Sequence, residues 1–218
     1  MLFQLFPLLL LWAAPATTPD VVHSLDQAEV MREQNLNGYT VIEQYTVRNS
    51  HLDTPAEMTV ETVYKKGAGK TFKILSRSGP SILQSSVLDR LLASEREMSL
   101  GATREHALIT SANYDIVPSG DAMLGSTKCK LVDLNPHAKS TFLIKGKAWL
   151  NADDYSLVRL EGKPTASPSF FAGHPYIVRD YMSFEGFSLA TQSRATSQSL
   201  IMGKTEVTIT YKDYKIQR

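Results

Sequence analysis

The stretch from Lys139 to Gly162 constrains the fold of this chain more than any other. Its sequence, KSTFLIKGKAWLNADDYSLVRLEG, contains two segments of alternating apolar and polar residues, joined at Asn151-Ala152-Asp153. Such alternation is typical of half-buried β-strands, and Asn and Asp tolerate the left-handed backbone of tight turns. We therefore predict a β-hairpin in which Leu150 pairs with Asp154.

The predicted hairpin has one apolar face whose centre is built from small residues. The expected cross-strand pairs are Ile144–Leu160, Gly146–Val158 and Ala148–Ser156. On the opposite, charged face we expect Trp149 beside Tyr155 as a cross-strand aromatic pair. Small residues between large apolar ones leave room for one of the protein's own helices, or for a ligand, to lie across this face.

The composition indicates one domain and excludes one class of partner. The chain has 218 residues, of which 43% are hydrophobic, enough for one sizeable core. Basic and acidic residues number 23 and 22, for a net charge of +1. Nucleic-acid binding needs a concentrated positive surface, so we expect no nucleic-acid partner.

Residues 1–16, MLFQLFPLLLLWAAPA, have the pattern of a secretory signal peptide. Their apolar run is about eleven residues long, too short to span a bilayer core that needs about twenty. We predict cleavage after Ala16, export to the periplasm and a mature domain over residues 17–218. No Lys or Arg precedes the apolar run, so an uncleaved interfacial anchor is the alternative. No Cys lies near the signal to be acylated, and we expect a soluble protein.

The first third of the chain predicts one helix and then three strands. Ser24–Gln27 has the pattern of a capping box, and the helix that it starts is expected to end at Asn37-Gly38. Apolar residues then alternate over 39–47, 58–64 and 72–76. The spacing of these three segments is that of an antiparallel meander.

The apolar spacing becomes helical again after Ser78-Gly79-Pro80. Ser86 and Asp89 have the spacing of a second cap, and this helix is expected to end at Gly101. Its apolar stripe contains Val87, Leu88, Leu91, Leu92 and Met98. The charged residues between them are expected to face water, Glu95 included.

The remainder reads mostly as strands. We expect a short helix at 104–110 and then a loop at 113–120, where Pro118 breaks any regular structure. Cys129–Leu134 should form a strand before the hairpin, and further strands are expected at 176–184, 187–193 and 205–214. The predicted fold class is α+β, a single antiparallel incomplete β-barrel with helices covering its concave face.

No motif in the sequence indicates catalysis, a metal site or a cofactor. Lys66–Thr71 resembles the end of a phosphate-binding loop, but that loop needs a glycine five residues before Gly69, where Tyr64 stands. The five histidines are scattered, with no pair at helical spacing. Glu95 and Glu97, two residues apart on a helix, point in different directions. We expect a hairpin turn at Lys66–Thr71, a protein that is not an enzyme, and no bound metal or cofactor.

The apolar rows of the sheet and of the second helix are expected to face one concave space. A single curved sheet of this size, with about three helices, leaves part of that face open to a ligand. Ordinary core packing is the alternative for each residue taken singly. The predicted lipid-binding residues are Val41, Tyr45, Val60, Phe72, Ile74, Leu88, Leu91, Leu92, Phe142, Ile144, Val158, Leu160, Val207 and Ile209.

Several stretches, together with the order of elements, resemble the LolA-like periplasmic carriers, also described as outer-membrane lipoprotein-sorting proteins. They are Gly69–Phe72 with Ser78-Gly79-Pro80, Lys145–Leu150 with Arg159–Pro164, Pro168-Ser169-Phe170, and Thr208–Tyr211 near Asp213-Tyr214. The resemblance implies an incomplete β-barrel whose apolar concave face receives acyl chains under a helical lid.

As a function, the resemblance implies a soluble exported carrier that sorts acylated lipoproteins or lipids toward the outer membrane. Its partners would be the cargo, an inner-membrane donor and an outer-membrane acceptor, with transient membrane contact at Phe170-Phe171. That aromatic pair could equally close the cavity mouth or pack in the core. A stress-sensing regulatory module of the same fold and a lipid-modifying enzyme are the alternative functions.

Overall fold

The computed structural model describes residues 20–168, 173–200 and 203–218. Its centre is one ten-stranded antiparallel sheet with the strand order β3-β2-β1-β10-β9-β8-β7-β6-β5-β4. The strands are β1 (Gly38–Asn49), β2 (Ala56–Lys65), β3 (Gly69–Ser78), β4 (Tyr114–Leu124), β5 (Thr127–Pro136), β6 (Ile144–Asn151), β7 (Leu157–Pro164), β8 (Tyr176–Phe184), β9 (Phe187–Ser199) and β10 (Gly203–Gln217).

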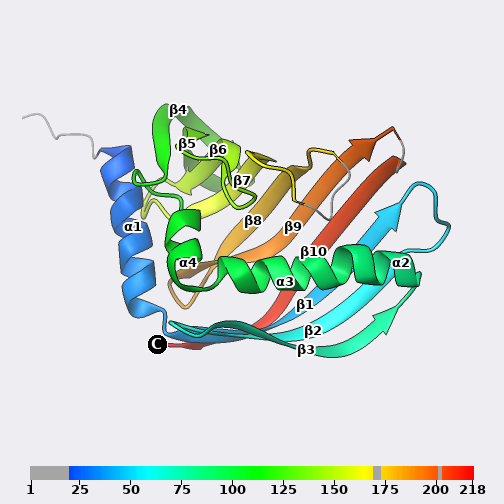
Figure 1. Cartoon of the computed structure of the whole chain (residues 1–218). Coiled ribbons are helices and arrows are strands. Elements are labelled where there is room, and N and C mark those ends of the chain that lie inside the picture. The colour runs from blue at the N-terminus through cyan, green and yellow to red at the C-terminus, as the bar shows by residue number, and fades with distance from the viewer. Residues whose placement is uncertain (1–19, 169–172, 201–202) are drawn as a thin grey trace, which may run out of the picture.

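The strand order explains why the sheet curves without closing. The chain enters the sheet at β1, the third strand from one edge, and runs out to the edge strand β3. It then crosses to the other edge strand β4 and returns strand by strand to β10 beside β1. The two edge strands do not pair with each other. The sheet is therefore an incomplete barrel with a concave face, as predicted (Figure 1).

The crossing between the two edges is helical and lies over the concave face (Figure 1). It consists of α2 (Ser81–Leu83), a π-helical turn η1 (Gln84–Leu88), α3 (Asp89–Met98) and α4 (Gly101–Ala107). We refer to Ser81–Ala107 as the cover segment. The N-terminal helix α1 (Val21–Asn35) packs near β4–β7, where Leu25 is buried in their core.

The register of the β6–β7 hairpin differs from the prediction by four residues. Ala148 pairs with Leu160, Gly146 with Gly162 and Ile144 with Pro164. The connection is longer than a tight turn, because Asn151 and Asp154 side chains accept from the backbone amides of Asp153 and Ser156, and Tyr155 adopts φ 58°. Trp149 consequently lies opposite Arg159, so the predicted pairing with Tyr155 is wrong.

Both predicted helix caps are wrong as well. Helix α1 begins four residues earlier than expected, with the Asp20 side chain accepting from the amide of Val22 at 3.0 Å. In the cover segment the helical turns begin at Ser81, and the Ser86 hydroxyl donates to the carbonyl of Ile82 instead of capping. A side-chain pattern that fits a cap also fits the interior of a helix that starts earlier.

The predicted loop at 113–120 is mostly the edge strand β4. Pro118 lies at a register shift between β4 and β5, and an edge strand tolerates a residue without an amide proton at such a place. The turn at Lys66–Thr71 is a hairpin connection, as predicted, with Gly67 and Gly69 at positive φ. Cys129 is buried in β5, also as predicted.

Two predicted features fall outside the described residues: the signal peptide over residues 1–16 and the aromatic pair Phe170-Phe171. Within the described part of the chain, no helix has the length and apolar character needed to cross a bilayer.

Candidate ligand-binding cavity

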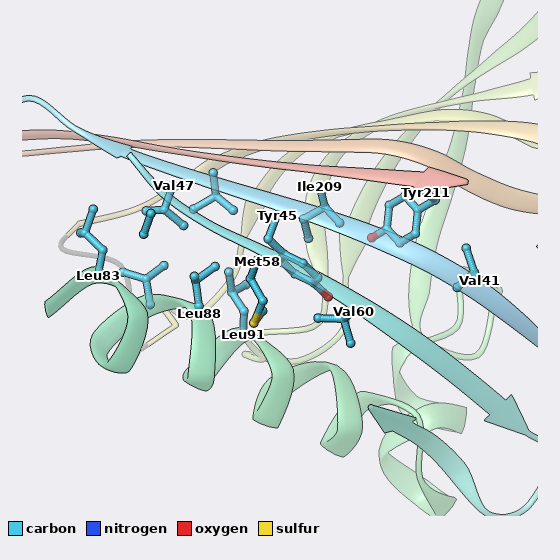
Figure 2. Close-up of a cluster of buried hydrophobic side chains, with 13 residues drawn as sticks. Val41, Tyr45, Val47, Met58, Val60, Leu83, Leu88, Leu91, Ile209 and Tyr211 are labelled. Carbon is cyan, nitrogen blue, oxygen red and sulfur yellow. The ribbon is translucent and has the colours of Figure 1, made fainter. Parts of the chain in front are cut away.

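The first half of the cover segment packs tightly onto β1, β2 and β10. Leu83, Leu88 and Leu91 point from the helix toward the sheet (Figure 2), and Val87 is buried in the same cluster. They meet a layer of buried side chains from the sheet, and Leu88 is 0% exposed. We call this region the packed half. Its sheet residues are Val41, Tyr45, Val47, Ala56, Met58, Val60, Val207, Ile209 and Tyr211.

Beyond Leu91 two adjoining cavities lie between the cover segment and the sheet. The first, of about 150 Å³, is mainly apolar, and we call it the apolar lobe. Residues that line it include Leu91, Met98, Ala107, Ile109, Phe142, Ile144, Leu160, Ile177, Ala195, Val207 and Ile209. A cavity of this size holds a guest as large as benzene. A full acyl chain therefore requires the cover segment to move.

The second cavity, of about 160 Å³, is lined by charged residues and tyrosines together with apolar side chains such as Leu157 and Leu189, and we call it the polar lobe because of its charged residues. Its lining includes Arg32, Lys70, Arg104, Tyr39, Tyr211 and Tyr214. Both lobes are lined by Glu95, Met98, Ala107, Ile109, Arg179 and Tyr181. The two lobes thus lie on either side of shared walls, and together we call them the hollow half of the interior.

The predicted cavity residues divide between the two halves. Those that line the apolar lobe are Leu91, Phe142, Ile144, Leu160, Val207 and Ile209. Those that only build or flank the packed half are Val41, Tyr45, Val60, Phe72, Leu88 and Leu92. Ile74 is 46% exposed on β3, and Val158 is partly buried at the bulge where β7 departs from regular pairing with β6.

Some lining residues were missed from the sequence. Ile177 and Ala195 face each other across β8 and β9 and both line the apolar lobe. Along β8 the inward row reads Ile177, Arg179, Tyr181, and a charged residue in its middle hides the apolar alternation that would have identified it. Met98 and Ile109 lie just before and just after α4. They line the cavity only because of the path that the cover segment takes across the sheet, which the sequence does not reveal.

A network of charged side chains lies between the packed half and the hollow half. The Lys70 ammonium lies 2.6 Å from a carboxylate oxygen of Glu95 and 4.0 Å from one of Glu43. The other Glu95 oxygen lies 3.7 Å from the Arg179 guanidinium. Tyr45 donates a hydrogen bond to Glu43, whose second oxygen has no hydrogen-bond partner among the described residues. These charges join β1, β3 and β8 to α3.

The pKa values of the two carboxyl groups in this charge network are shifted in opposite directions. Burial raises the pKa of Glu43 above its ordinary value, and the more distant Lys70 only partly offsets this. Burial also acts on Glu95, but Lys70 and Arg179 outweigh it and lower its pKa. Burial alone would lower the pKa of Lys70, yet Glu95 and Glu43 hold it well above the ordinary value. Glu95, Lys70 and Arg179 are therefore charged at neutral pH.

The prediction that Glu95 faces water is wrong. Glu95 is 8% exposed, because α3 turns this side of the helix onto the sheet, where Lys70 supplies the counter-charge. Lys70 also fixes the end of α3 through its backbone amide, which donates to the Ser99 hydroxyl at 2.8 Å. Arg104 then attaches α4 to α1 through Glu33 and lies 4.8 Å from the centre of the Tyr64 ring.

Comparisons with known proteins identify the fold. No protein-family model matches this sequence, and no curated protein matches it either. A LolA superfamily protein from Nitrosomonas europaea superposes with a TM-score of 0.50 over 90% of this chain and 94% of its own, at 10% identity. A domain from Vibrio parahaemolyticus, assigned to outer membrane lipoprotein sorting, gives 0.52 over 91% and 94%, also at 10% identity. The chain therefore has the LolA-like fold.

Proposed function

We propose that this protein is a non-enzymatic exported carrier that binds the acyl chains of lipids or lipoproteins between its cover segment and its concave sheet. The observation that supports this most is the apolar lobe, a cavity beneath an amphipathic helix on an open sheet. In this proposal the carrier works in the periplasm. It receives cargo from an inner-membrane donor and passes it to an outer-membrane acceptor.

The energetics of the interior are compatible with reversible loading. Burying an acyl chain contributes roughly 0.8 kcal/mol per methylene, so about a dozen methylenes supply about 10 kcal/mol. Moving the cover segment exposes Leu83, Val87, Leu88 and Leu91, at about 1.5–3 kcal/mol for each side chain. An acyl chain that replaces these contacts regains most of that cost. The free energy gained by burying an acyl chain is thus close to the free energy lost by moving the cover segment, so the two can replace each other reversibly.

The test is uptake of lipid by the purified protein. Native mass spectrometry after mild extraction should detect a bound lipid, and a fluorescent fatty-acyl probe should bind to the delipidated protein. Filling the apolar lobe with Ala195→Phe should weaken probe binding at least about tenfold. Thr196→Phe is the matched control, because it places the same ring on the exposed side of β9.

Absence of both lipid and probe binding in the wild-type protein would contradict the carrier proposal. Equal probe binding by the Ala195 and Thr196 variants would show that the acyl chain lies elsewhere.

A further inference from the structure

Arg179 occupies a distinctive place in the interior. It lies in the middle of β8, between Ile177 and Tyr181, and lines both the apolar lobe and the polar lobe. The Arg179 side chain is only partly exposed, and removing a charged group from water is costly unless its charge and its donors are satisfied. Its position at the boundary of an apolar cavity therefore needs a reason.

The protein itself satisfies the Arg179 guanidinium only in part. Its one carboxylate partner among the described residues is Glu95, at 3.7 Å, which is beyond hydrogen-bond distance. Its Nε donates to the Ser193 hydroxyl at 3.5 Å, the longest distance that still counts, and it also interacts with the Tyr181 hydroxyl. A guanidinium has five N–H donors in a planar fork. Among the described residues, no carboxylate lies closer to this fork than the Glu95 oxygen at 3.7 Å.

The other cations of the polar lobe are already paired. Lys70 lies 2.6 Å from Glu95, which is 1.1 Å closer than Arg179. Arg32 contacts Glu29 at 3.2 Å and Glu33 at 2.9 Å, and Arg104 donates twice to Glu33. Of these four cations, Arg179 is thus the one whose nearest carboxylate is the most distant, and it is the one that also borders the apolar lobe.

We propose that Arg179 binds the anionic headgroup, a carboxylate or a phosphate, of a lipid whose acyl chain occupies the apolar lobe. The fork of an arginine matches the two oxygens of either group and binds them in a bidentate way. The hydroxyl of Tyr181 lies beside it on the same strand and can donate to the same anion. Tyr211, buried on β10, lines the polar lobe as well.

This inference rests on the proposed carrier function and narrows its cargo. An acyl chain whose end is an amide or an ester carries no anion to place at Arg179. Once the cover segment has moved and enlarged the apolar lobe, a fatty acid or an alkyl phosphate places its headgroup at the boundary of the two lobes and its chain in the apolar lobe. The expected cargo is therefore an acidic lipid instead of the uncharged acyl groups of a lipoprotein.

The experiment compares three lipids that have the same twelve-carbon chain and different headgroups. Laurate, dodecyl phosphate and the neutral dodecanol each displace N-phenylnaphthylamine, an uncharged probe, from the delipidated full-length protein. We expect at least one anion to bind about tenfold or more tightly than dodecanol, as a charged hydrogen-bonded pair contributes. The tighter of laurate and dodecyl phosphate identifies the headgroup as carboxylate or phosphate.

Arg179→Gln should remove this preference, so that the two anions bind no more tightly than dodecanol does to the same variant. The matched control is Arg194→Gln, which changes an exposed arginine on the neighbouring strand β9. Anion preference that survives in Arg179→Gln would overturn the assignment of Arg179. If that variant does not fold, the comparison of heads in the wild-type protein still tests the inference.

Equal affinities of the wild-type protein for the three ligands would overturn the headgroup site and leave the carrier proposal intact. Failure of all three ligands, and of the probe, to bind would overturn both.

Discussion

The two halves of the interior lie under the same cover segment and differ in how completely it fills them. In the packed half, four side chains from Leu83 to Leu91 meet nine buried residues of β1, β2 and β10. In the hollow half, α3 and α4 stand over β7–β9 with cavities of about 150 and 160 Å³ beneath them. Helix sequence alone does not account for this, because apolar residues continue past Leu91 to Met98 and Ile109.

The difference follows from where the charged residues lie. Glu43, Lys70, Glu95 and Arg179 stand at the boundary, and a buried charge network keeps side chains at fixed distances where apolar ones would collapse together. The close packing of the packed half ends at these charges, and the cavities lie on their other side. The hollow half is therefore built into the fold at the expense of core packing.

The largest loss of stability is expected from removing a charge at the boundary between the packed half and the hollow half. Lys70→Met leaves Glu43 buried without its cation and leaves Glu95 with only the more distant Arg179, and it should lower the free energy of unfolding by about 3–5 kcal/mol. Urea unfolding at neutral pH measures it, with the exposed Lys73→Met on the same strand as control. A loss below about 1 kcal/mol would mean that the network does not hold the cover segment.

Truncating one large side chain in each half compares their packing directly. Leu88→Ala removes a fully buried side chain from the packed half and should cost near the upper end of about 2–5 kcal/mol. Ile109→Ala, in the wall of the hollow half, should cost near the lower end, because a cavity wall already lacks contacts on one side. Equal losses in urea unfolding would contradict the distinction between the halves.

The pH dependence of stability separates the two carboxyl groups at the boundary. The folded pKa of Glu43 is raised above 4.5, so its contribution is present below that pH and is lost as pH rises through the folded pKa. Glu43→Gln should therefore gain stability relative to wild type as pH rises above 4.5. Urea unfolding at a series of pH values measures this difference.

Glu95 should behave in the opposite way. Its folded pKa is lowered below 4.5, so its contribution is present above that pH and is lost as pH falls through the folded pKa. Glu95→Gln should be destabilised relative to wild type above pH 4.5, and the deficit should shrink as the pH falls. Parallel pH profiles for the two variants would contradict the assigned directions.

The smallest effect is expected at the outer edge of the packed half. Arg77 on β3 forms an ion pair with Asp89 at the start of α3, and both side chains are partly exposed. Exposed pairs contribute about 0–1 kcal/mol, so Arg77→Ala should leave the midpoint of urea unfolding nearly unchanged. A loss comparable to that of Lys70→Met would show that surface pairing, and not the buried network, fixes the cover segment.

Much of the fold could be predicted because its signals are local. The switch from helical to strand spacing at Asn37-Gly38 and the return to helical spacing after Ser78-Gly79-Pro80 are visible in the order of apolar residues. The register of the β6–β7 hairpin was wrong by four residues, since it depends on the exact geometry of the connection at Asn151–Ser156. The predicted helix caps were wrong for a similar reason, because a helix that begins at any of several residues fits the same pattern of capping side chains.

The candidate site was predictable only on its apolar side. Leu91, Ile144 and Ile209 belong to alternating or helical rows, and such rows identify a buried face whatever covers it. The sequence by itself thus determined the order of elements and the apolar surface that faces inward. Only the tertiary structure decided that Lys70, Glu95 and Arg179 meet inside, because a charged residue is buried or exposed according to partners that lie far away in the chain.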